Sequence, residues 1–159
     1  MKFNRNYLSE YKELIKTTDL QKGYQEFIKL FRFLRTELKK ALPEYDFSGH
    51  IVENNMDFAY FQLSDDELRA SGLKIQVIFI HKDFRFEVWV SGYNRKIQCA
   101  YYEKLRAKTI PYALNNNPNQ VDYIIKTPLN ENLDLGNGFG VLEEIKAGVL
   151  ECVKYIKTV

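Results

Sequence analysis

The sequence predicts an α+β domain in which an antiparallel sheet of about four strands is covered on one face by helices. Two observations lead to this prediction. Apolar residues recur at helical spacing in two long segments, residues 19–42 and 139–157, which indicates amphipathic helices. Between them, three segments from residue 57 to residue 91 are rich in β-branched and aromatic residues and alternate between apolar and polar, as strands do. With no linker or repeat in between, we expect one domain over residues 1–159.

The first long helix is expected to begin near Thr18. Thr18 and Gln21 have the spacing of a capping box, in which side chains satisfy the first free N–H groups of a helix. Pro43 ends the pattern because proline cannot continue a helix. The apolar stripe in between consists of Leu20, Tyr24, Phe27, Phe31, Leu34, Leu38 and Leu42. A shorter helix over residues 6–16 is expected to precede it.

The elements between the two long helices are short. In order, we expect a short strand near 50–53, a turn at 54–55, a strand at 57–63, a helical turn opened by a Ser64–Glu67 capping box, strands at 73–81 and 84–91, a helix at 93–107, a loop at 108–119 and a strand at 121–127. The last helix, 139–157, carries Leu142, Ile145, Val149, Cys152 and Ile156 along one face. The place of strand 121–127 in the sheet does not follow from the sequence.

The hairpin of strands 73–81 and 84–91 has a register that its own pattern supports. A turn at Lys82-Asp83 pairs residue 80 with 85, 78 with 87, 76 with 89 and 74 with 91. One face then carries only Ile75, Val77, Phe79, Phe86, Val88 and Val90. A slip of one residue would mix the two faces. A four-residue loop of the same register parity also satisfies the pattern.

The opposite face of these strands, which we call the mixed face, carries Tyr60, Gln62, Gln76, Arg85, Glu87 and Trp89. It is too polar for a dry core and too aromatic for an ordinary solvent-facing surface, so it suits a ligand, a protein partner or a second copy of the chain. We expect Phe86 and Val88 to belong to the core and Glu87 to lie outside it.

Five residues are candidates for ligand binding on the mixed face. Tyr60 and Trp89 offer rings for stacking, Arg85 and Arg95 offer charge-assisted hydrogen bonds, and Glu87 orients an arginine or the ligand. The function expected from this set is that of a non-catalytic binding module for a small polar or anionic ligand or a protein partner. The competing interpretation is structural, because same-face pairs such as Arg85 with Glu87 are ordinary in sheets.

An enzyme is the alternative function. Glu87 would act as a general base in a hydrolase-type reaction, with Arg85 or Lys126 stabilising negative charge. A nuclease built on Asp57, Glu87 and Lys126 is a weaker version, because the lysine usually found two residues after the strand carboxylate is here Trp89.

Other chemistry has little support in the sequence. The two histidines, His50 and His81, lie on different elements without metal-binding spacing, and we expect no metal and no cofactor. Cys99 and Cys152 fall in helical patterns and are expected to be unpaired. The glycine-rich stretch GNGFG, residues 136–140, does not fit a phosphate-binding loop. It has Val141 where a third glycine is needed, no Gly-Lys-Ser/Thr follows it, and it does not directly follow a strand.

The charge balance and the N-terminal segment bear on partners and location. With 23 basic and 21 acidic residues, the net charge of +2 offers no broad attraction to nucleic acid or to an anionic membrane. The first sixteen residues are too polar for a signal peptide, and no apolar run has membrane-spanning length. We therefore expect a cytoplasmic protein.

Three segments resemble a family of small uncharacterised bacterial cytoplasmic proteins, a domain of unknown function. They are QKGYQEFIKLFRFLRTEL, MDFAYFQL and LKIQVIFIHKDFRFEVWVSGYNRKIQ, and within the last of them FRFEVWVSGYNRKIQ is the most specific. The resemblance covers about residues 20–155. It implies a one-domain module and assigns no catalytic residue.

Overall fold

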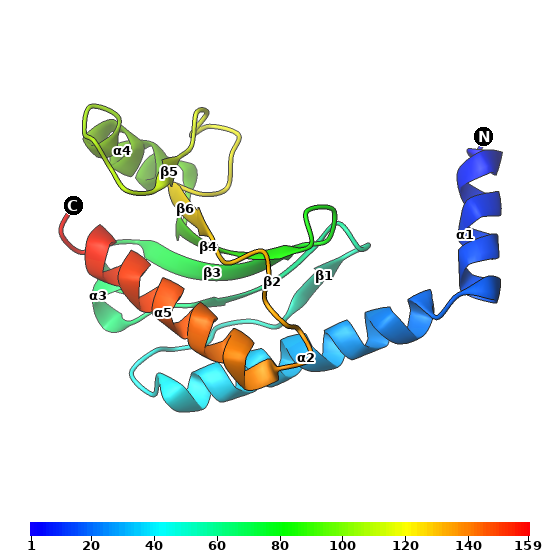
Figure 1. Cartoon of the computed structure of the whole chain (residues 1–159). Coiled ribbons are helices and arrows are strands. Elements are labelled where there is room, and N and C mark those ends of the chain that lie inside the picture. The colour runs from blue at the N-terminus through cyan, green and yellow to red at the C-terminus, as the bar shows by residue number, and fades with distance from the viewer.

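A six-stranded antiparallel sheet with two long helices on one face forms the centre of the computed structural model, which describes residues 1–159 (Figure 1). Along the chain the elements are α1 (Arg5–Thr17), α2 (Leu20–Ala41), β1 (Val52–Asn54), β2 (Phe58–Leu63), α3 (Asp66–Ala70), β3 (Leu73–Ile80), β4 (Arg85–Gly92), α4 (Arg95–Leu105), β5 (Ala113–Leu114), β6 (Ile125–Pro128) and α5 (Gly138–Ile156). The strand order is β1-β2-β3-β4-β6-β5. The α+β class is therefore confirmed, with six strands instead of about four.

Beyond four strands there are two short ones: β1 corresponds to the short strand expected near 50–53, and β5 arises in a segment expected to be a loop. β5 has only two residues, and it pairs with β6 through Ala113↔Lys126 and Leu114↔Ile125. A strand this short leaves no periodic signal in the sequence. β6 in turn pairs with β4, so the strand whose place was unknown lies beside the hairpin.

The apolar face of the sheet is covered by α2 and α5, which lie side by side beneath it in Figure 1. All six apolar hairpin side chains are buried, as expected from the alternation. Phe31 of α2 connects the layers, because its ring stacks on Phe86 with centroids 6.0 Å apart and meets Phe61 edge-on at 5.4 Å. Burying side chains of this size contributes about 1.5–3 kcal/mol each, which is why these helices dock on this face.

The hairpin register is the one that the sequence predicts. Ile80 pairs with Arg85, Gln76 with Trp89 and Lys74 with Ser91. The connection is a tight turn around Lys82-Asp83, closed by a hydrogen bond from the N–H of Phe84 to the carbonyl of His81 at 3.1 Å. Phe84 adopts a positive φ of 49° to re-enter the strand.

Neither predicted capping box forms. Asp65, not Ser64, caps α3 by accepting the N–H of Leu68 at 2.8 Å, because Ser64 is still part of the sheet and is buried there. At α2, Asp19 is the N-cap residue and makes no side-chain capping bond. The hydroxyl of Thr18 donates to the carbonyl of Leu14 in the last turn of α1 and accepts the N–H of Leu20 at 3.3 Å, but it makes no bond with Gln21.

The other face of the sheet carries no long helix. α4 and β5 rise from it near one end, and α1 stands away from the body at the opposite end (Figure 1). No helix combines the length and the apolar character needed to cross a membrane. The mixed face is thus left open along much of its length.

Candidate functional site

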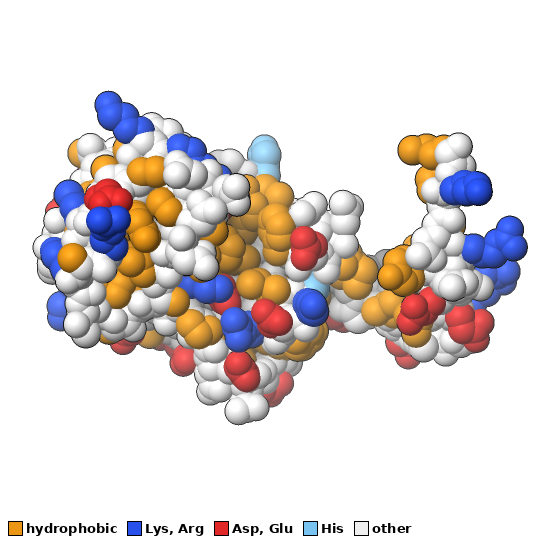
Figure 2. Space-filling model, turned by 90° about the horizontal axis from the view of Figure 1, so that it is seen from above, with side chains coloured by type: hydrophobic (Ala, Val, Ile, Leu, Met, Phe, Trp, Pro, Cys, Tyr) orange, Lys and Arg blue, Asp and Glu red, His pale blue; other side chains and the backbone are white.

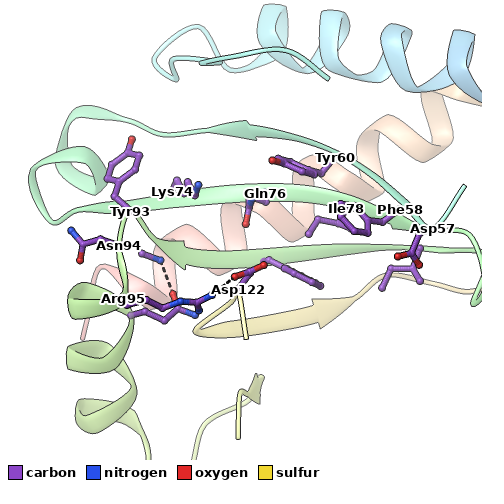
Figure 3. A pocket seen from close by; sticks show the side chains of 14 residues that line it. Asp57, Phe58, Tyr60, Lys74, Gln76, Ile78, Tyr93, Asn94, Arg95 and Asp122 are labelled. Carbon is purple, nitrogen blue, oxygen red and sulfur yellow. Dashed lines mark hydrogen bonds and ion pairs between the residues drawn. The ribbon is translucent and has the colours of Figure 1, made fainter. Parts of the chain in front are cut away.

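The mixed face holds a pocket of about 550 Å³, placed between β2, β3, β4 and the start of α4 (Figure 3). Its apolar lining comes from Phe58, Tyr60, Ile78, Ile80 and Trp89, and its polar lining includes Asp57, Lys74, Gln76, Arg95 and Asp122. Figure 2 shows this side from above, with hydrophobic side chains exposed near the middle of the body. A volume of this size, with mostly apolar walls and a few convergent polar groups, is typical of small-molecule sites.

The aromatic walls come from neighbouring strands. The alternation of β2 points Phe58 and Tyr60 to the same side, and β3 places Ile78 directly across from Tyr60. Trp89 lies across from Gln76, and its ring packs against Tyr123 with centroids 4.9 Å apart. Trp89 is nevertheless only half-buried, so a ligand in the pocket can reach its ring.

Lys74 is the cation of the pocket that has no partner. Its side chain is half-buried and forms no hydrogen bond or ion pair, and its Nζ lies 5.9 Å from the centre of the Tyr93 ring. Burial lowers the pKa of Lys74, and the negative charge of Asp122 opposes that effect only in part. Asp122 gives its own ion pair to Arg95. Lys74 therefore offers an ammonium group to the pocket that the protein itself does not neutralise.

A buried amide forms part of the pocket floor beside Lys74. The Oε1 atom of Gln76 lies 2.6 Å from the hydroxyl of Ser91, which also approaches the carbonyl of Asp122 at 2.7 Å. The Nε2 atom of Gln76 makes no hydrogen bond within the chain. The pocket floor thus adds a fixed neutral donor to the charged donor of Lys74.

Arg95 holds the wall of the pocket in place. Its Nη2 donates to Asp122 Oδ1 at 2.6 Å, and its Nη1 donates to the carbonyl of Val121. These bonds attach the start of α4 to the segment that leads into β6, as the dashed contact with Asp122 in Figure 3 shows. Arg95 lines the pocket, and both of its terminal nitrogens already form hydrogen bonds within the chain.

Glu87 lies outside the apolar core, as predicted, but it is fully buried, at 0% exposure. It is on the mixed face, but three side chains cover it. Its Oε1 accepts Nε and Nη2 of Arg85 at 3.1 and 2.8 Å, and its Oε2 accepts the indole N–H of Trp89 at 2.7 Å and Nζ of Lys126 at 3.1 Å. Burial alone would raise the pKa of Glu87, but these hydrogen bonds outweigh it and the pKa is lowered.

The five candidate residues thus separate into two groups. Tyr60, Trp89 and Arg95 line the pocket, whereas Arg85 and Glu87 form a structural cluster on the far side of Trp89. Arg85 starts β4 and Arg95 follows its end, so roughly 20 Å of extended chain separates them and they do not converge. Trp89 belongs to both groups, since its ring faces the pocket and its N–H holds Glu87.

The sequence reasoning missed the most telling residue of the pocket. Lys74 is on the mixed face by the predicted register, opposite Ser91. Nothing in the sequence shows that neighbouring acids pair elsewhere and leave Lys74 alone. Its position in the sequence does give one indication: Lys74 and Ser91 form the next pair after Gln76 and Trp89 on the mixed face.

Three side chains that could act as bases or nucleophiles, those of Glu87, Lys126 and Cys152, are poorly suited to that task. Glu87 is held as a carboxylate by its donors, and Lys126 is committed to it. Asp57 lines the end of the pocket away from Lys74 and is not part of the cluster around Glu87. Burial raises the pKa of Cys152 to about 12, so its thiol stays protonated at neutral pH.

Comparison with known proteins gives one match. A family model for a domain of unknown function, DUF7000, matches residues 4–159. No curated protein and no solved structure matches the chain. The matched residues include α1, both covering helices, the whole sheet and the pocket on its mixed face.

Proposed function

The chain belongs to the DUF7000 family of domains of unknown function, and we propose that it is a binding module whose pocket on the mixed face holds a small aromatic carboxylate. The observation that carries the proposal is Lys74, a half-buried ammonium without a partner in a pocket with aromatic walls. The Glu87 cluster supports the floor by fixing Trp89.

The anionic group of the ligand is inferred from the cost of leaving Lys74 alone. Taking an ammonium out of water without a counter-charge is unfavourable, and the lowered pKa of Lys74 reflects that cost. A carboxylate beside Nζ supplies the missing counter-charge, and the free Nε2 of Gln76 can donate a second hydrogen bond to it. A charge-assisted hydrogen bond of this kind contributes about 1.5–3 kcal/mol.

The pocket's remaining charges favour a carboxylate over a more highly charged anion. Arg95 and Asp122 neutralise each other at 2.6 Å, which leaves Lys74 as the one free positive charge at that end. Asp57 lies at the other end, beyond Ile78 and Phe58 in Figure 3. A single negative charge is balanced by Lys74, whereas a phosphate dianion would leave one negative charge unbalanced in a pocket that also holds Asp57.

The flat apolar part of the ligand is inferred from the rings along the pocket. Tyr60 and Phe58 lie between the Lys74 end and the Asp57 end (Figure 3). Trp89 also lines the pocket and pairs with Gln76, two residues along β3 from Lys74. Aromatic side chains of this kind prefer offset-stacked or edge-on contacts with another ring. An aromatic acid therefore places its carboxylate at Lys74 and its ring among these side chains.

A matched pair of ligands tests the proposal. Benzoate and benzamide have nearly the same size, and only benzoate carries a charge; phenyl phosphate adds the higher charge. Trp89 is the only tryptophan and lines the pocket, so its fluorescence reports binding. We expect benzoate to bind more tightly than benzamide and phenyl phosphate.

Lys74→Met should weaken benzoate binding about 10- to 100-fold, which corresponds to the loss of a charge-assisted hydrogen bond, and should leave benzamide binding unchanged. Lys82→Met is the matched control, because Lys82 is exposed in the hairpin turn away from the pocket. Equal binding of benzoate by wild type and Lys74→Met, or no binding of any of the three compounds, would contradict the proposal. In the second case, a protein segment or a second copy on the mixed face becomes the better interpretation.

The location proposed for this module is a bacterial cytoplasm. Both cysteines are free thiols, Cys99 half-buried and Cys152 buried. Free thiols persist in a reducing compartment, which supports the proposal. Fractionation of cells that express the tagged chain from its own gene tests it.

A further inference from the structure

The N-terminal helix α1 carries an apolar stripe that no part of the chain covers. Phe3 precedes the helix, and Tyr7, Tyr11 and Leu14 follow at helical spacing along one face, with Leu8 at its edge. Phe3, Tyr7 and Tyr11 are 62–74% exposed, and no residue of α1 is buried. Figure 1 shows α1 projecting from the end of α2, away from the sheet.

A helix of this length needs a partner to be stable. An isolated helix of 13 residues is marginal in water, and most helical stability in proteins comes from packing an apolar face. The backbone of Thr18 is extended, with φ −126° and ψ 168°, and this directs α1 away from α2. We therefore expect the apolar stripe of α1 to pack against another molecule.

The same chain has an apolar groove that nothing fills. The groove has a volume of about 630 Å³ and runs along the first half of α2 and the start of α5. Phe27, Leu30 and Phe33 line it, and Phe84 and Phe139 stand at its borders, each 64% exposed. An apolar groove of this kind is the usual receptor for one face of an amphipathic helix.

Gly23 is a second, independent sign that another backbone approaches the groove. It lies inside α2, where glycine lowers helix stability relative to alanine. A Cβ atom added at Gly23 would meet nothing within 4 Å, so no contact within the chain requires the glycine. Gly23 lines the groove and leaves room for close contact with a helix.

We propose that α1 of one copy docks in the groove of a second copy, and that the exchange is reciprocal. Reciprocal exchange creates a two-fold symmetric dimer in which every apolar stripe and every groove is filled. The lengths are compatible: α1 is about 20 Å long, and the α2 segment that lines the groove, from Gly23 to Phe33, is about 15 Å long.

The buried area is sufficient for a stable dimer. Fully covering a Phe or Tyr side chain buries roughly 150–250 Å², so the three exposed rings of α1 offer on the order of 400 Å². The groove contributes a similar area, and reciprocity doubles the total to roughly 1,600 Å², the size of a standard specific interface. Leu8 and Leu14 add to this.

The oligomeric state of the full chain tests the proposal through two variants and a control. Tyr11→Glu places a charge on the stripe, and Gly23→Glu places a charged side chain at the groove, where the added Cβ atom meets no atom of the chain within 4 Å. Ser9→Glu adds the same charge to the opposite face of α1. By light scattering after size exclusion, we expect dimers for the wild type and Ser9→Glu, and monomers for the other two. Unchanged fluorescence of Trp89, the only tryptophan, which lies on β4, confirms that the body of each variant is folded.

Mixing the two monomeric variants identifies the docking partner. The Gly23→Glu copy has an intact α1 and the Tyr11→Glu copy has an intact groove, so a mixture should form heterodimers with one contact, which bind more weakly than the wild type. A monomeric wild type overturns the proposal, including the case in which α1 folds back on its own groove. A Gly23→Glu variant that still dimerises also overturns it, because it shows that α1 pairs with a different surface.

Discussion

Replacing Glu87 by glutamine tests whether the buried carboxylate holds the end of the mixed face together. Four donor nitrogens from Arg85, Trp89 and Lys126 converge on its two oxygens at 2.7–3.1 Å. Glutamine keeps the shape of the side chain but has one acceptor oxygen and no charge. Arg85 and Lys126 would then lose their shared counter-ion.

The expected loss in the free energy of unfolding depends on the burial of Glu87 and on how far Arg85 and Lys126 can turn toward water once the carboxylate is gone. Removing one member of a buried ion pair costs about 3–5 kcal/mol when the other stays buried. The side chains of Arg85 and Lys126 are 25% and 22% exposed, so both can turn toward water, and Arg85 keeps Glu131 at 3.3 Å. The glutamine oxygen can still accept the N–H of Trp89. We therefore expect Glu87→Gln to cost about 2–3 kcal/mol.

Urea unfolding followed by circular dichroism measures this loss without relying on Trp89. Glu131→Gln is the control, because Glu131 also pairs with Arg85 but is largely exposed, and it should change stability by less than about 1 kcal/mol. Equal losses for the two variants would refute the reasoning, since Glu87 would then be no more than a surface partner of Arg85.

The same comparison predicts a pH dependence. The folded-state pKa of Glu87 lies below its ordinary value, so the stabilisation by its ionised form is complete above the unfolded-state pKa of about 4.3. That stabilisation is lost as the pH falls through the folded-state pKa. The difference in stability between wild type and Glu87→Gln should narrow in acid. A constant difference from neutral pH to strongly acidic pH would be inconsistent with a role for the charge.

Three further outcomes follow from the fold. Phe86→Ala should lower the free energy of unfolding by about 3–5 kcal/mol, because it opens a cavity between the sheet and α2; a loss below 1 kcal/mol in urea melts would speak against this packing. Gly72→Ala should cost at least about 1 kcal/mol, since Gly72 has φ +71° and an added Cβ would lie 2.1 Å from Ile97, and a neutral effect in the same assay would contradict that geometry. A reductant should leave the thermal midpoint unchanged because Cys99 and Cys152 are both free; a fall of several degrees would reveal a disulfide.

Much of the sheet could be predicted because its alternation is strict. One register separates six apolar side chains from every polar one in the hairpin, so the pairing of Gln76 with Trp89 follows from the pattern alone. The amphipathic stripes of α2 and α5 likewise predict which face they cover. β5 and the helix caps could not be predicted, because they depend on one or two residues whose contacts come from distant segments, such as Ser64 with Asp46.

The candidate site was predicted only in part because exposure depends on tertiary packing. The pattern places Glu87 on the mixed face, but the arrival of Lys126 on β6 and the turn of Arg85 across it decide that it is buried. In the same way, Asp122 forms its ion pair with Arg95, and Lys74 is left without an ion pair. Such pairings join residues far apart in sequence, and charge alternation along one strand does not reveal them.

The pKa of the Lys74 ammonium, measured by NMR of the lysine side chains with and without benzoate, tests the central claim most directly. Lys74→Met identifies the resonance. In the free protein, burial holds this pKa below that of ordinary lysines. A carboxylate bound beside Nζ favours the charged form, so saturating benzoate should raise the pKa of Lys74, whereas benzamide should not. A pKa that is the same with benzoate, with benzamide and without ligand would contradict the account of this pocket as a site for aromatic carboxylates.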